Sequence, residues 1–245
     1  MTTRIALISD IHANLVALEA VLADVDQVGV DHLIFLGDAL TIGPQPKAVV
    51  ERLKGLGCPC IRGNHEDFLL DLPGLHNGSH APWYIAVAEW CAAQLEPADF
   101  AFLKSFQPTC QLALDATNDL LCCHGSPKSN TDQILPTISD ADLTAMLADH
   151  PDRVIACGHT HLPLVRRLLG QTVVNVGSVG APFTVFPFEG QPQLVPWAEY
   201  GVIGWNNGRL QIDLRQVPLD LDDLRASALS TDMPGAAGWA ATWPS

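Results

Sequence analysis

The sequence lacks the features of a membrane-spanning, secreted or nucleic-acid-binding protein. No apolar run approaches the roughly 20 residues that cross a bilayer, so we expect no membrane partner. The first residues, MTTRIALISDIH, contain one arginine and no small-residue cleavage site, and they predict no secretory signal. Basic residues are scarce, since 13 Lys and Arg stand against 27 Asp and Glu. The net charge of −14 argues against a nucleic-acid partner, although local metal cations would still admit an anionic substrate.

Cysteine shows no regular pattern. The seven cysteines are an odd number, and no CxxC pair of the kind used in zinc sites occurs among them. We therefore expect reduced thiols and a cytoplasmic protein rather than a disulfide framework. Cys58 with Cys60, and Cys122 with Cys123, lie in strand-like runs, where we expect buried apolar thiols.

Five short apolar runs each end in a cluster of glycine and polar residues. The runs are RIALIS, HLIFL, CPCI, DLLCC and RVIAC, followed by DIH, GDALTIG, RGNHE, HGSP and GHTH. Helical patterns over residues 14–25 and 44–57 separate the first three runs. This alternation, with about 30 residues per unit, predicts parallel strands joined by right-handed crossovers. Ligands gather beyond the carboxyl ends of such strands, so the five clusters should meet at one edge.

The clusters contain eight side chains that can bind metal ions or transfer protons: Asp10, His12, Asp38, Asn64, His65, His124, His159 and His161. Taken singly, Asp10 or Asn64 has an alternative role as a helix cap, and His124 as a loop histidine. Eight such residues after five successive strands favour a shared site instead. Carboxylates, imidazoles and an amide suit manganese, iron or zinc. These ligands are too many for one ion, so we expect two divalent metal ions and one bridging carboxylate.

The order and spacing of these clusters resemble those of the calcineurin-like metallophosphoesterase superfamily, from about residue 4 to about residue 180. The matching motifs are DxH at 10–12, GDxxxxG at 37–43, GNHE at 63–66, the strand-terminal His124 and GHxH at 158–161. The turn NVGSVG at 175–180 also resembles the NxGS turn of that family. Within the superfamily the chain is most similar to the small prokaryotic phosphoesterases grouped with diadenosine tetraphosphatases. The resemblance implies an α/β fold, a four-layer αββα sandwich of two mixed β-sheets flanked by helices.

The resemblance also implies a role for each residue. One ion would bind Asp10, His12 and His161, the other Asn64, His124 and His159, and Asp38 would bridge the two. His65 would be the catalytic general acid for the leaving group, with a purely structural role beside the metals as the alternative.

The implied activity is dinuclear metal-dependent hydrolysis of phosphoesters, in which a hydroxide held between the ions attacks a small phosphodiester or nucleotide-type substrate. Symmetrical dinucleoside polyphosphate hydrolysis and protein serine/threonine phosphatase activity are alternatives. A non-catalytic scaffold of the same fold is weakened as an alternative, because such scaffolds are expected to have eroded ligands and none of the eight residues is missing.

Two positions depart from the protein phosphatases of the superfamily. Their GDxVDRG motif supplies an aspartate that orients the catalytic histidine and an arginine that holds phosphate, whereas this chain has Thr41 and Ile42. These changes weaken the protein-phosphatase alternative and favour substrates with good leaving groups. After the NxGS turn, residues 181–190 read APFTVFPFEG, which predicts either a less charged substrate pocket or a packed strand.

We expect one domain over residues 1–230, with a candidate cap or lid at 66–118 that begins with turn formers and continues as helix, break, helix. His76 and His80 in this segment are expected to make loop or lid contacts rather than to bind metal. Lys128 is either a phosphate contact or a surface lysine.

The last part of the chain contains a hairpin signal and an irregular tail. Asn207 and Gly208 separate two alternating runs, which predicts a hairpin in the second sheet. Residues 231–245 show no periodicity, and they are either disordered or docked through Trp239 and Trp243. The sequence leaves the substrate-binding residues and the oligomeric state undetermined.

Overall fold

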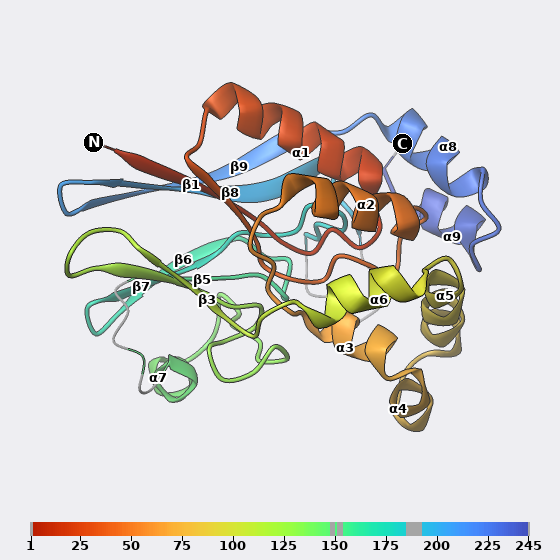
Figure 1. Ribbon diagram of the computed structural model, residues 1–245, viewed down its shortest axis with the longest axis horizontal. Helices are drawn as coiled ribbons and strands as arrows, with labels where there is room; N and C mark the ends of the chain where they lie inside the picture. The colour runs from red at the N-terminus through yellow and green to blue at the C-terminus, as the bar shows by residue number, and fades with distance from the viewer. Residues whose placement is uncertain (1, 148–149, 151–153, 185–192, 245) are drawn as a thin grey trace.

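Two β-sheets lie face to face, with helices on their outer sides, in a computed structural model of the protein (Figure 1). The structure describes residues 2–147, 150, 154–184 and 193–244. This arrangement confirms the αββα sandwich expected from the sequence. Across the described residues, no helix is both long enough and apolar enough to span a membrane.

The first sheet has the strand order β2-β1-β8-β9. Its strands are β1 (Thr3–Ile8), β2 (His32–Phe35), β8 (Trp197–Asn206) and β9 (Arg209–Pro218). The pair β1 and β2 is parallel, as predicted, and α1 (Leu15–Val28) and α2 (Pro46–Leu56) follow these strands on the outer face (Figure 1). The predicted hairpin joins β8 to β9 through Asn207 and Gly208, both with a left-handed backbone. It extends the sheet of β1 and β2, not the other sheet.

The second sheet has the strand order β3-β4-β5-β7-β6. Its strands are β3 (Cys110–Ala113), β4 (Asp119–Cys122), β5 (Val154–Cys157), β6 (Leu164–Leu168) and β7 (Gln171–Asn175). The three central strands are parallel and the two edge strands are antiparallel. The helix α7 (Asp140–Leu147) packs on the outer face of this sheet.

The five apolar runs are therefore divided between two sheets, and one of them is not a regular strand. Residues 58–61 form only isolated bridges, from Cys60 to Phe35 and from Ile61 to Gln107. The physical reason is Pro59, which has no backbone N–H to donate to a sheet ladder. The run nevertheless carries the chain to the same edge as β1 and β2, so the RGNHE cluster arrives where the prediction put it.

The space between the sheets is filled by the inward side chains of the strands. Ile5 and Leu7 of β1 face Leu120 of β4 and Val174 of β7, while the alternate residues of β1 face the outer helices. Burial of each such side chain contributes roughly 1.5–3 kcal/mol, which explains why the strands read as continuous apolar runs.

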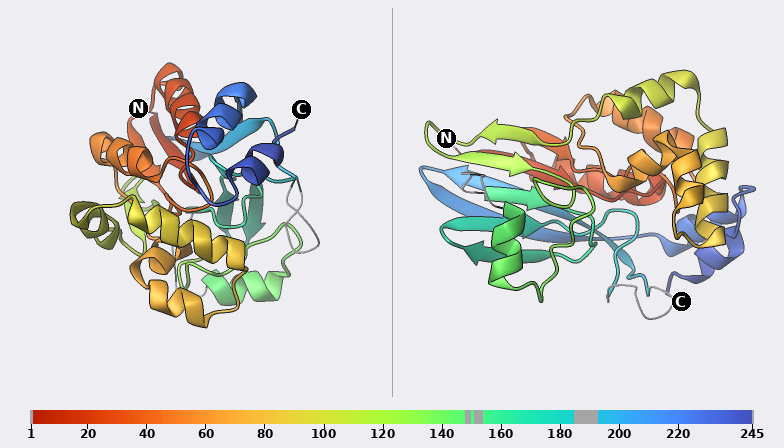
Figure 2. Two further views of the ribbon diagram at one scale, coloured as in Figure 1. Left: turned by 90° about the vertical axis from the view of Figure 1, so that its right-hand side faces the viewer. Right: turned by 90° about the horizontal axis from the view of Figure 1, so that it is seen from below.

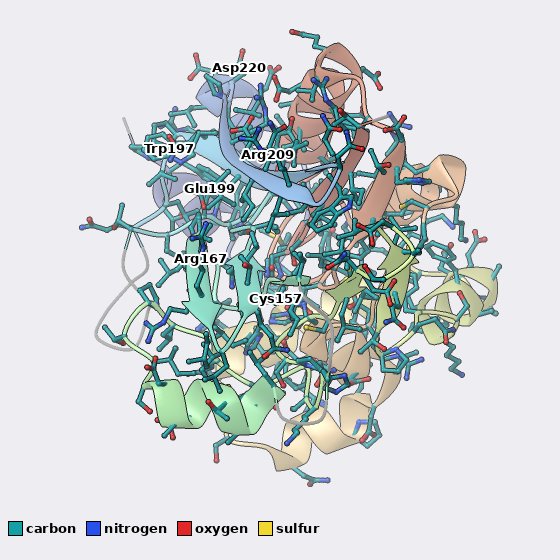
Figure 3. All side chains as sticks on the ribbon, turned by 90° about the vertical axis from the view of Figure 1, so that its left-hand side faces the viewer. Cys157, Arg167, Trp197, Glu199, Arg209 and Asp220 are labelled. Atoms are coloured by element: carbon teal, nitrogen blue, oxygen red, sulfur yellow. The ribbon has the colours of Figure 1, made fainter. Side chains whose placement is uncertain are left out.

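One carboxylate lies at the end of this inter-sheet core. Glu199 and Trp197 lie at the start of β8 (Figure 3), and Trp197 Nε1 donates a hydrogen bond of 3.1 Å to Glu199 Oε1. The second oxygen, Glu199 Oε2, is buried and has no hydrogen-bond partner among the described residues.

A group of helices projects from one end of the sandwich (Figure 2). It consists of α3 (Asn64–Leu70), α4 (Leu72–Asn77), α5 (Pro82–Ala93) and α6 (Pro97–Lys104). These helices account for most of the segment 66–118, whose final residues enter the second sheet as β3.

The tail is docked rather than extended away from the domain. After α8 (Leu221–Leu229), the chain forms α9 (Ala236–Ala241), and Trp243 is only 3% exposed within the outer core of the first sheet. Trp239 packs against the same core, and Trp90 Nε1 of α5 donates a 2.8 Å hydrogen bond to Asp232 Oδ1.

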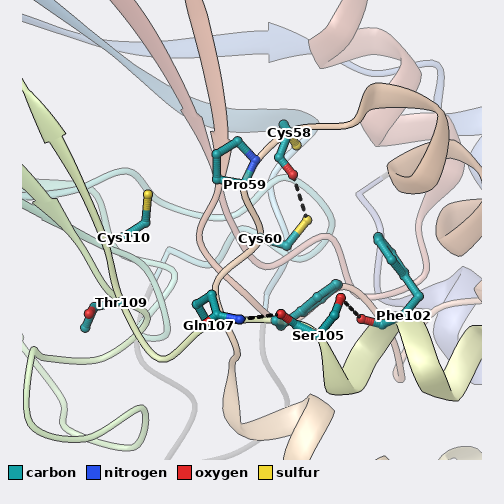
Figure 4. Close-up of a pocket in the computed structure, with 9 residues that line it drawn as sticks. Cys58, Pro59, Cys60, Phe102, Ser105, Gln107, Thr109 and Cys110 are labelled. Atoms are coloured by element: carbon teal, nitrogen blue, oxygen red, sulfur yellow. Dashed lines mark hydrogen bonds between the residues drawn. The ribbon is translucent and has the colours of Figure 1, made fainter.

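All seven cysteines are free thiols, and they differ in burial. Cys122 and Cys123 are buried as predicted. Cys58 and Cys60 are only half-buried, and with Cys110 they line a cavity of about 290 Å³ beside the end of α6 (Figure 4). None of the eight predicted site residues lines this cavity.

Candidate metal centre

The loops that follow β1 and β2 run side by side and hold the first ligands. Asp10 N–H donates to Gly37 O at 2.9 Å and His12 N–H donates to Asp38 O at 3.0 Å, so the strand pairing continues into the loops. The loop conformation differs from the strands, because several residues at this edge have a left-handed backbone. Their φ angles are 54° at Asp10, 49° at His12, 55° at Ala13, 62° at Asp38, 68° at Thr41, 67° at Ile42, 66° at His159 and 57° at His161.

Each of these side-chain-bearing residues is strained by about 1–2 kcal/mol. Such strain persists only where surrounding contacts fix the backbone, and it is concentrated at functional sites. At Asp10 these contacts come from the NxGS turn, because Gly180 N–H and Ser178 Oγ–H both donate to Asp10 O, at 2.9 and 2.8 Å.

The carboxylate of Asp10 accepts a backbone hydrogen bond at one oxygen, and its other oxygen lies 3.2 Å from His161 Nε2. Asp10 Oδ2 accepts the His159 N–H at 3.0 Å. Asp10 Oδ1 is buried and has no hydrogen-bond partner in the described part of the chain. A buried acceptor without a donor is costly in a folded protein, and a bound cation would satisfy it.

Three histidines are oriented by backbone carbonyls in the same way. The Nδ1 atoms of His12, His124 and His161 lie 3.4, 2.9 and 2.6 Å from the carbonyl oxygens of Leu40, Leu36 and Ala181. A proton on each Nδ1 donates to its carbonyl, so each Nε2 presents a lone pair to the site. The Nε2 atoms of His12 and His161 are 3.0 Å apart. Two lone pairs at this distance repel, and either a bound metal ion or, without one, a proton on His161 would remove the repulsion.

The ligand atoms form two adjacent groups. One contains Asp10, His12 and His161, and the other contains Asp38, His124 and His159, with all ligand atoms of a group within 4.8 Å of one another. Asn64 Oδ1 joins the second group at 3.1 Å from His124 Nε2. A third group joins Asp38 to His12 and His65. All eight residues selected from the sequence therefore lie together, and the donor set fits divalent ions.

The charges of the centre are balanced by histidines when no ion is bound. Burial opposes ionisation of Asp10 and Asp38, yet His161 and His124 respectively hold the pKa of each carboxyl below its ordinary value. Burial also opposes a charge on His124, yet Asp38 raises the pKa of this imidazole to about 10. By contrast, burial lowers the pKa of His159 to about 4. A metal ion would thus displace a proton from the centre on binding.

Glu66 was not singled out by sequence reasoning, although it belongs to the GNHE motif. Its carboxylate accepts the N–H groups of Asp38, Ala39 and Gly63, at 2.9, 2.7 and 2.8 Å. Burial and the neighbouring Asp38 raise the pKa of Glu66 to about 7. Glu66 therefore fixes the loop that carries Asp38, and its position at the end of the motif was the available signal.

His65 lies at the border between the metal-binding groups and the projecting helices. Its Nε2 is 3.7 Å from Asp38 Oδ2. Its Nδ1 contacts two hydroxyl oxygens, those of Thr41 and of Tyr84, the latter at 2.9 Å. Nothing in the local sequence pointed to Tyr84, which reaches the site from α5.

A second aromatic residue was also missed. The ring of Phe183 stacks on His161, with centroids 4.5 Å apart and an interplanar angle of 6°. Phe183 belongs to the apolar segment 181–190, of which residues 185–190 lie outside the described residues. The described part of the segment thus packs against a candidate metal ligand.

The other candidate side chains have partners elsewhere. His76 Nε2 is 2.9 Å from Glu89 Oε1 on the surface. His80 packs against Phe68, with ring centroids 5.0 Å apart. Lys128 Nζ donates to Ala145 O at 2.7 Å.

Comparison with known proteins identifies the family. The family model for the calcineurin-like phosphoesterase superfamily domain matches residues 3–190. The chain belongs to this superfamily. As a calcineurin-like phosphoesterase it is a metal-dependent hydrolase that acts on ester bonds, as the motifs predicted. An uncharacterized protein of Methanocaldococcus jannaschii is 29% identical over 182 residues, which cover 71% of this chain and 69% of that protein.

Two solved structures share the fold of this calcineurin-like phosphoesterase. A metallophosphoesterase from Sphaerobacter thermophilus has a TM-score of 0.73 and 24% identity, and the match covers 98% of this chain and 99% of that chain. A hypothetical protein from Pyrococcus horikoshii has a TM-score of 0.80 and 17% identity, with 95% and 94% covered. At these identities the likeness establishes the architecture, and the chemistry must be argued from the site.

Proposed function

We propose that this phosphoesterase uses two divalent ions to hydrolyse small phosphodiesters or nucleotide-type substrates. The observation that carries the proposal is the pair of adjacent ligand groups, because Asp38 belongs to one of them and also forms a group with His12 of the other. Asp10, His12 and His161 would hold one ion. Asn64, His124 and His159 would hold the other, with Asp38 common to both.

Manganese, iron and zinc all suit this mixture of carboxylate, imidazole and amide ligands. When bound, ions of this kind would supply a water activated as a nucleophile near neutral pH and would withdraw charge from the oxygens of a phosphoryl group. The remaining chemistry falls to the protein, which must deliver a proton to the leaving group.

We assign this proton transfer to His65, and the position of its ring supports the assignment. Its Nε2 faces Asp38 and the ligand groups, while its Nδ1 is turned away toward the projecting helices. A proton on Nε2 would pass to the leaving oxygen as the phosphorus–oxygen bond breaks. The side chain is half-buried, which keeps the ring in a fixed position beside the substrate.

The surroundings of His65 favour substrates with good leaving groups. Burial lowers the pKa of His65, and its Nδ1 meets the uncharged hydroxyls of Thr41 and Tyr84 rather than a carboxylate. The charged imidazolium is therefore poorly supported, so a substrate whose leaving group departs as a stable anion loses least. Ile42 supplies no guanidinium for a dianionic terminal phosphate, which favours a diester or an anhydride.

The test is a substrate panel on purified protein loaded separately with manganese, iron or zinc. We expect kcat/KM to be highest for a bis-aryl phosphate or a dinucleoside polyphosphate and lowest for a phosphoserine peptide. A clear preference for the phosphopeptide would favour a protein phosphatase. Two bound metals without turnover of any substrate would favour a scaffold.

A further inference from the structure

Aromatic rings continue outward from His65 into the projecting helices. Phe68 lies one turn after His65 on α3, with ring centroids 5.5 Å apart, and Tyr84 meets His65 from α5 at 5.4 Å. His80, just before α5, packs against both rings, 5.0 Å from Phe68 and 5.8 Å from Tyr84. The outermost ring is Trp83, 5.8 Å from Tyr84. Together, Phe68, His80, Trp83 and Tyr84 form what we call the aromatic cluster.

Packing accounts for the inner rings of the aromatic cluster but not for Trp83. Tyr84 is 8% exposed, and Phe68 and His80 are half-buried, as expected of side chains that join α3 to α5. Trp83 is 61% exposed, and it is the one exposed tryptophan in the described part of the chain. Because it continues a row of rings that starts at His65, it is not an isolated apolar residue on the surface. Exposed aromatic surface beside a site is typical of a ligand contact.

The place of Trp83 within the cluster indicates the size of the group that it would contact. In the proposed reaction the leaving oxygen meets His65 Nε2, and the ring of Tyr84 separates Trp83 from His65. The ring of a simple aryl ester is bonded directly to the leaving oxygen, so it would lie beside His65. In a nucleotide leaving group, phosphate and ribose lie between that oxygen and the base. The base therefore extends farther out, toward the position of Trp83.

The chemistry of the cluster also suits a nucleobase. Phe68, Trp83 and Tyr84 carry no charge near neutral pH, so they offer ring faces and edges to a flat uncharged group rather than to a phosphate. Bases of bound nucleotides commonly stack on such side chains. Since every base has a flat face, a contact of this kind discriminates little between one base and another.

We propose that the aromatic cluster binds the nucleobase of a nucleotide leaving group, with Trp83 as the stacking surface. The inference rests on the proposed function for the position of the leaving oxygen. It deepens that function by naming the substrate class, which is a phosphodiester or phosphoanhydride that releases a nucleotide. It also gives the segment 66–118, from which the cluster comes, a role in substrate recognition.

The first test measures binding and does not depend on turnover. Isothermal titration calorimetry on manganese-loaded protein compares AMP with ribose 5-phosphate, which lacks the base. We expect the wild type to bind AMP about tenfold more tightly, the size of one stacked base. Trp83→Leu keeps apolar bulk without a flat ring and should lose this preference, whereas Trp83→Phe should keep most of it. A wild type that binds both ligands equally, or a Trp83→Leu variant with the full preference, would overturn the inference.

Trp90 provides a matched control on the same helix. It is half-buried, and its Nε1 donates to Asp232 Oδ1 of the docked tail at 2.8 Å. Trp90→Leu makes the same substitution two turns farther along α5, and we expect its preference for AMP to equal that of the wild type. An equal loss of the preference in Trp90→Leu and Trp83→Leu would indicate a change in the helix rather than a lost stack, and it would overturn the inference.

The second test connects the cluster to the reaction. We expect Trp83→Leu to raise the KM for a dinucleoside polyphosphate about tenfold more than the KM for a bis-aryl phosphate. Its kcat for the dinucleotide should change little, because a distant base is held alike in the ground state and the transition state. An equal rise in KM for both substrates would contradict the assignment to a nucleobase. Absence of turnover of every substrate, with the preference for AMP intact, would refute the proposed function and leave the base-binding site standing.

Discussion

Among single residues, Asp38 is the candidate ligand that lies close both to His12 and His65 and to His124 and His159. Oδ1 accepts the His65 N–H at 2.9 Å, and Oδ2 lies 3.2 Å from His124 Nε2. Because Asp38 would contact both ions, we expect Asp38→Asn to lose more metal than any other single ligand change. Elemental analysis after dialysis measures this, with Asp10→Asn as the comparison. Two ions retained at wild-type affinity would contradict the bridging role.

His65 differs from the neighbouring candidate ligands because it would contact the substrate and not the metal ions. We expect His65→Ala to bind both ions and to lose turnover by roughly 10²–10⁴-fold, the usual contribution of a general acid. The measurement combines metal content with kcat for a poor leaving group. Near wild-type rates on that substrate would mean that His65 is not the acid.

Glu199 is a residue whose effect should appear in stability and not in catalysis. Burial raises its pKa above the ordinary value of 4.5. A raised carboxyl pKa favours the folded state below the unfolded pKa, and this contribution is lost as pH rises through the folded pKa. Glu199→Gln keeps an acceptor for Trp197 but cannot ionise, so its free energy of unfolding relative to the wild type should increase from about pH 4.5 upward.

Urea denaturation at several pH values measures this difference between Glu199→Gln and the wild type. Glu51→Gln is the control, because the Glu51 side chain is 64% exposed and pairs with Lys47 one turn away on the surface of the same helix. A Glu199→Gln difference that stays constant with pH would show that the buried carboxyl is not the cause.

At the scale of elements, α2 and α6 are joined by one buried carboxylate. Asp99 of α6 is 1% exposed and lies 2.8 Å from Lys47 Nζ and 2.6 Å from Lys54 Nζ, both on α2, while it also accepts the Glu96 N–H. Burial opposes the charge of Asp99, but the two lysines hold its pKa below the ordinary value.

A lowered carboxyl pKa contributes stability above the unfolded pKa, and this contribution is lost as pH falls toward the folded pKa. Asp99→Asn should therefore lower the free energy of unfolding by about 1 kcal/mol near neutral pH, a modest value because both lysines are partly open to solvent. The loss should shrink in acid. Denaturation at pH 7 and pH 3 checks this, with the fully exposed Asp222→Asn as control. An equal loss at both pH values would contradict it.

The elements that sequence reasoning predicted are those whose signals are local. The helix α1 is capped by Asn14, the first residue of the helical pattern predicted at 14–25, and β1 and β2 are apolar along most of their length. Residues 58–61 have the same apolar character but form no regular strand, because Pro59 cannot donate to a ladder. In the site, the motif residues carried their own signal. Tyr84 and Phe183 did not, since only tertiary packing brings them to histidines far away in the sequence.

At the scale of the whole molecule, the candidate metal-binding groups lie across the boundary between the two sheets. Asp10, His12 and Asp38 follow strands of the first sheet, whereas His124, His159 and His161 follow strands of the second. Ions bound here would connect the sheets as well as serve catalysis. Metal that binds only the folded state adds stability by mass action, about 2.7 kcal/mol at one hundred times its dissociation constant.

We therefore expect the melting temperature to rise with zinc or manganese concentration and to fall when a chelator is added. Thermal denaturation across a metal titration measures this. Asp38→Asn should respond less than the wild type, because it binds less metal. A melting temperature that changes with neither metal nor chelator would indicate that the two sheets are held together by their apolar core alone.

The left-handed backbone at the candidate ligand positions also affects how this site can change by mutation during evolution. Asparagine and glycine adopt this conformation at least as readily as aspartate and histidine. A single-base change turns an aspartate codon into one for asparagine or glycine, and a histidine codon into one for asparagine. Such a change at Asp10, His12 or His159 would remove or weaken a candidate ligand, and it would keep the left-handed backbone or relieve its strain. A protein of this fold that is no longer under selection for the reaction should therefore lose its candidate metal ligands early, while the αββα sandwich is retained.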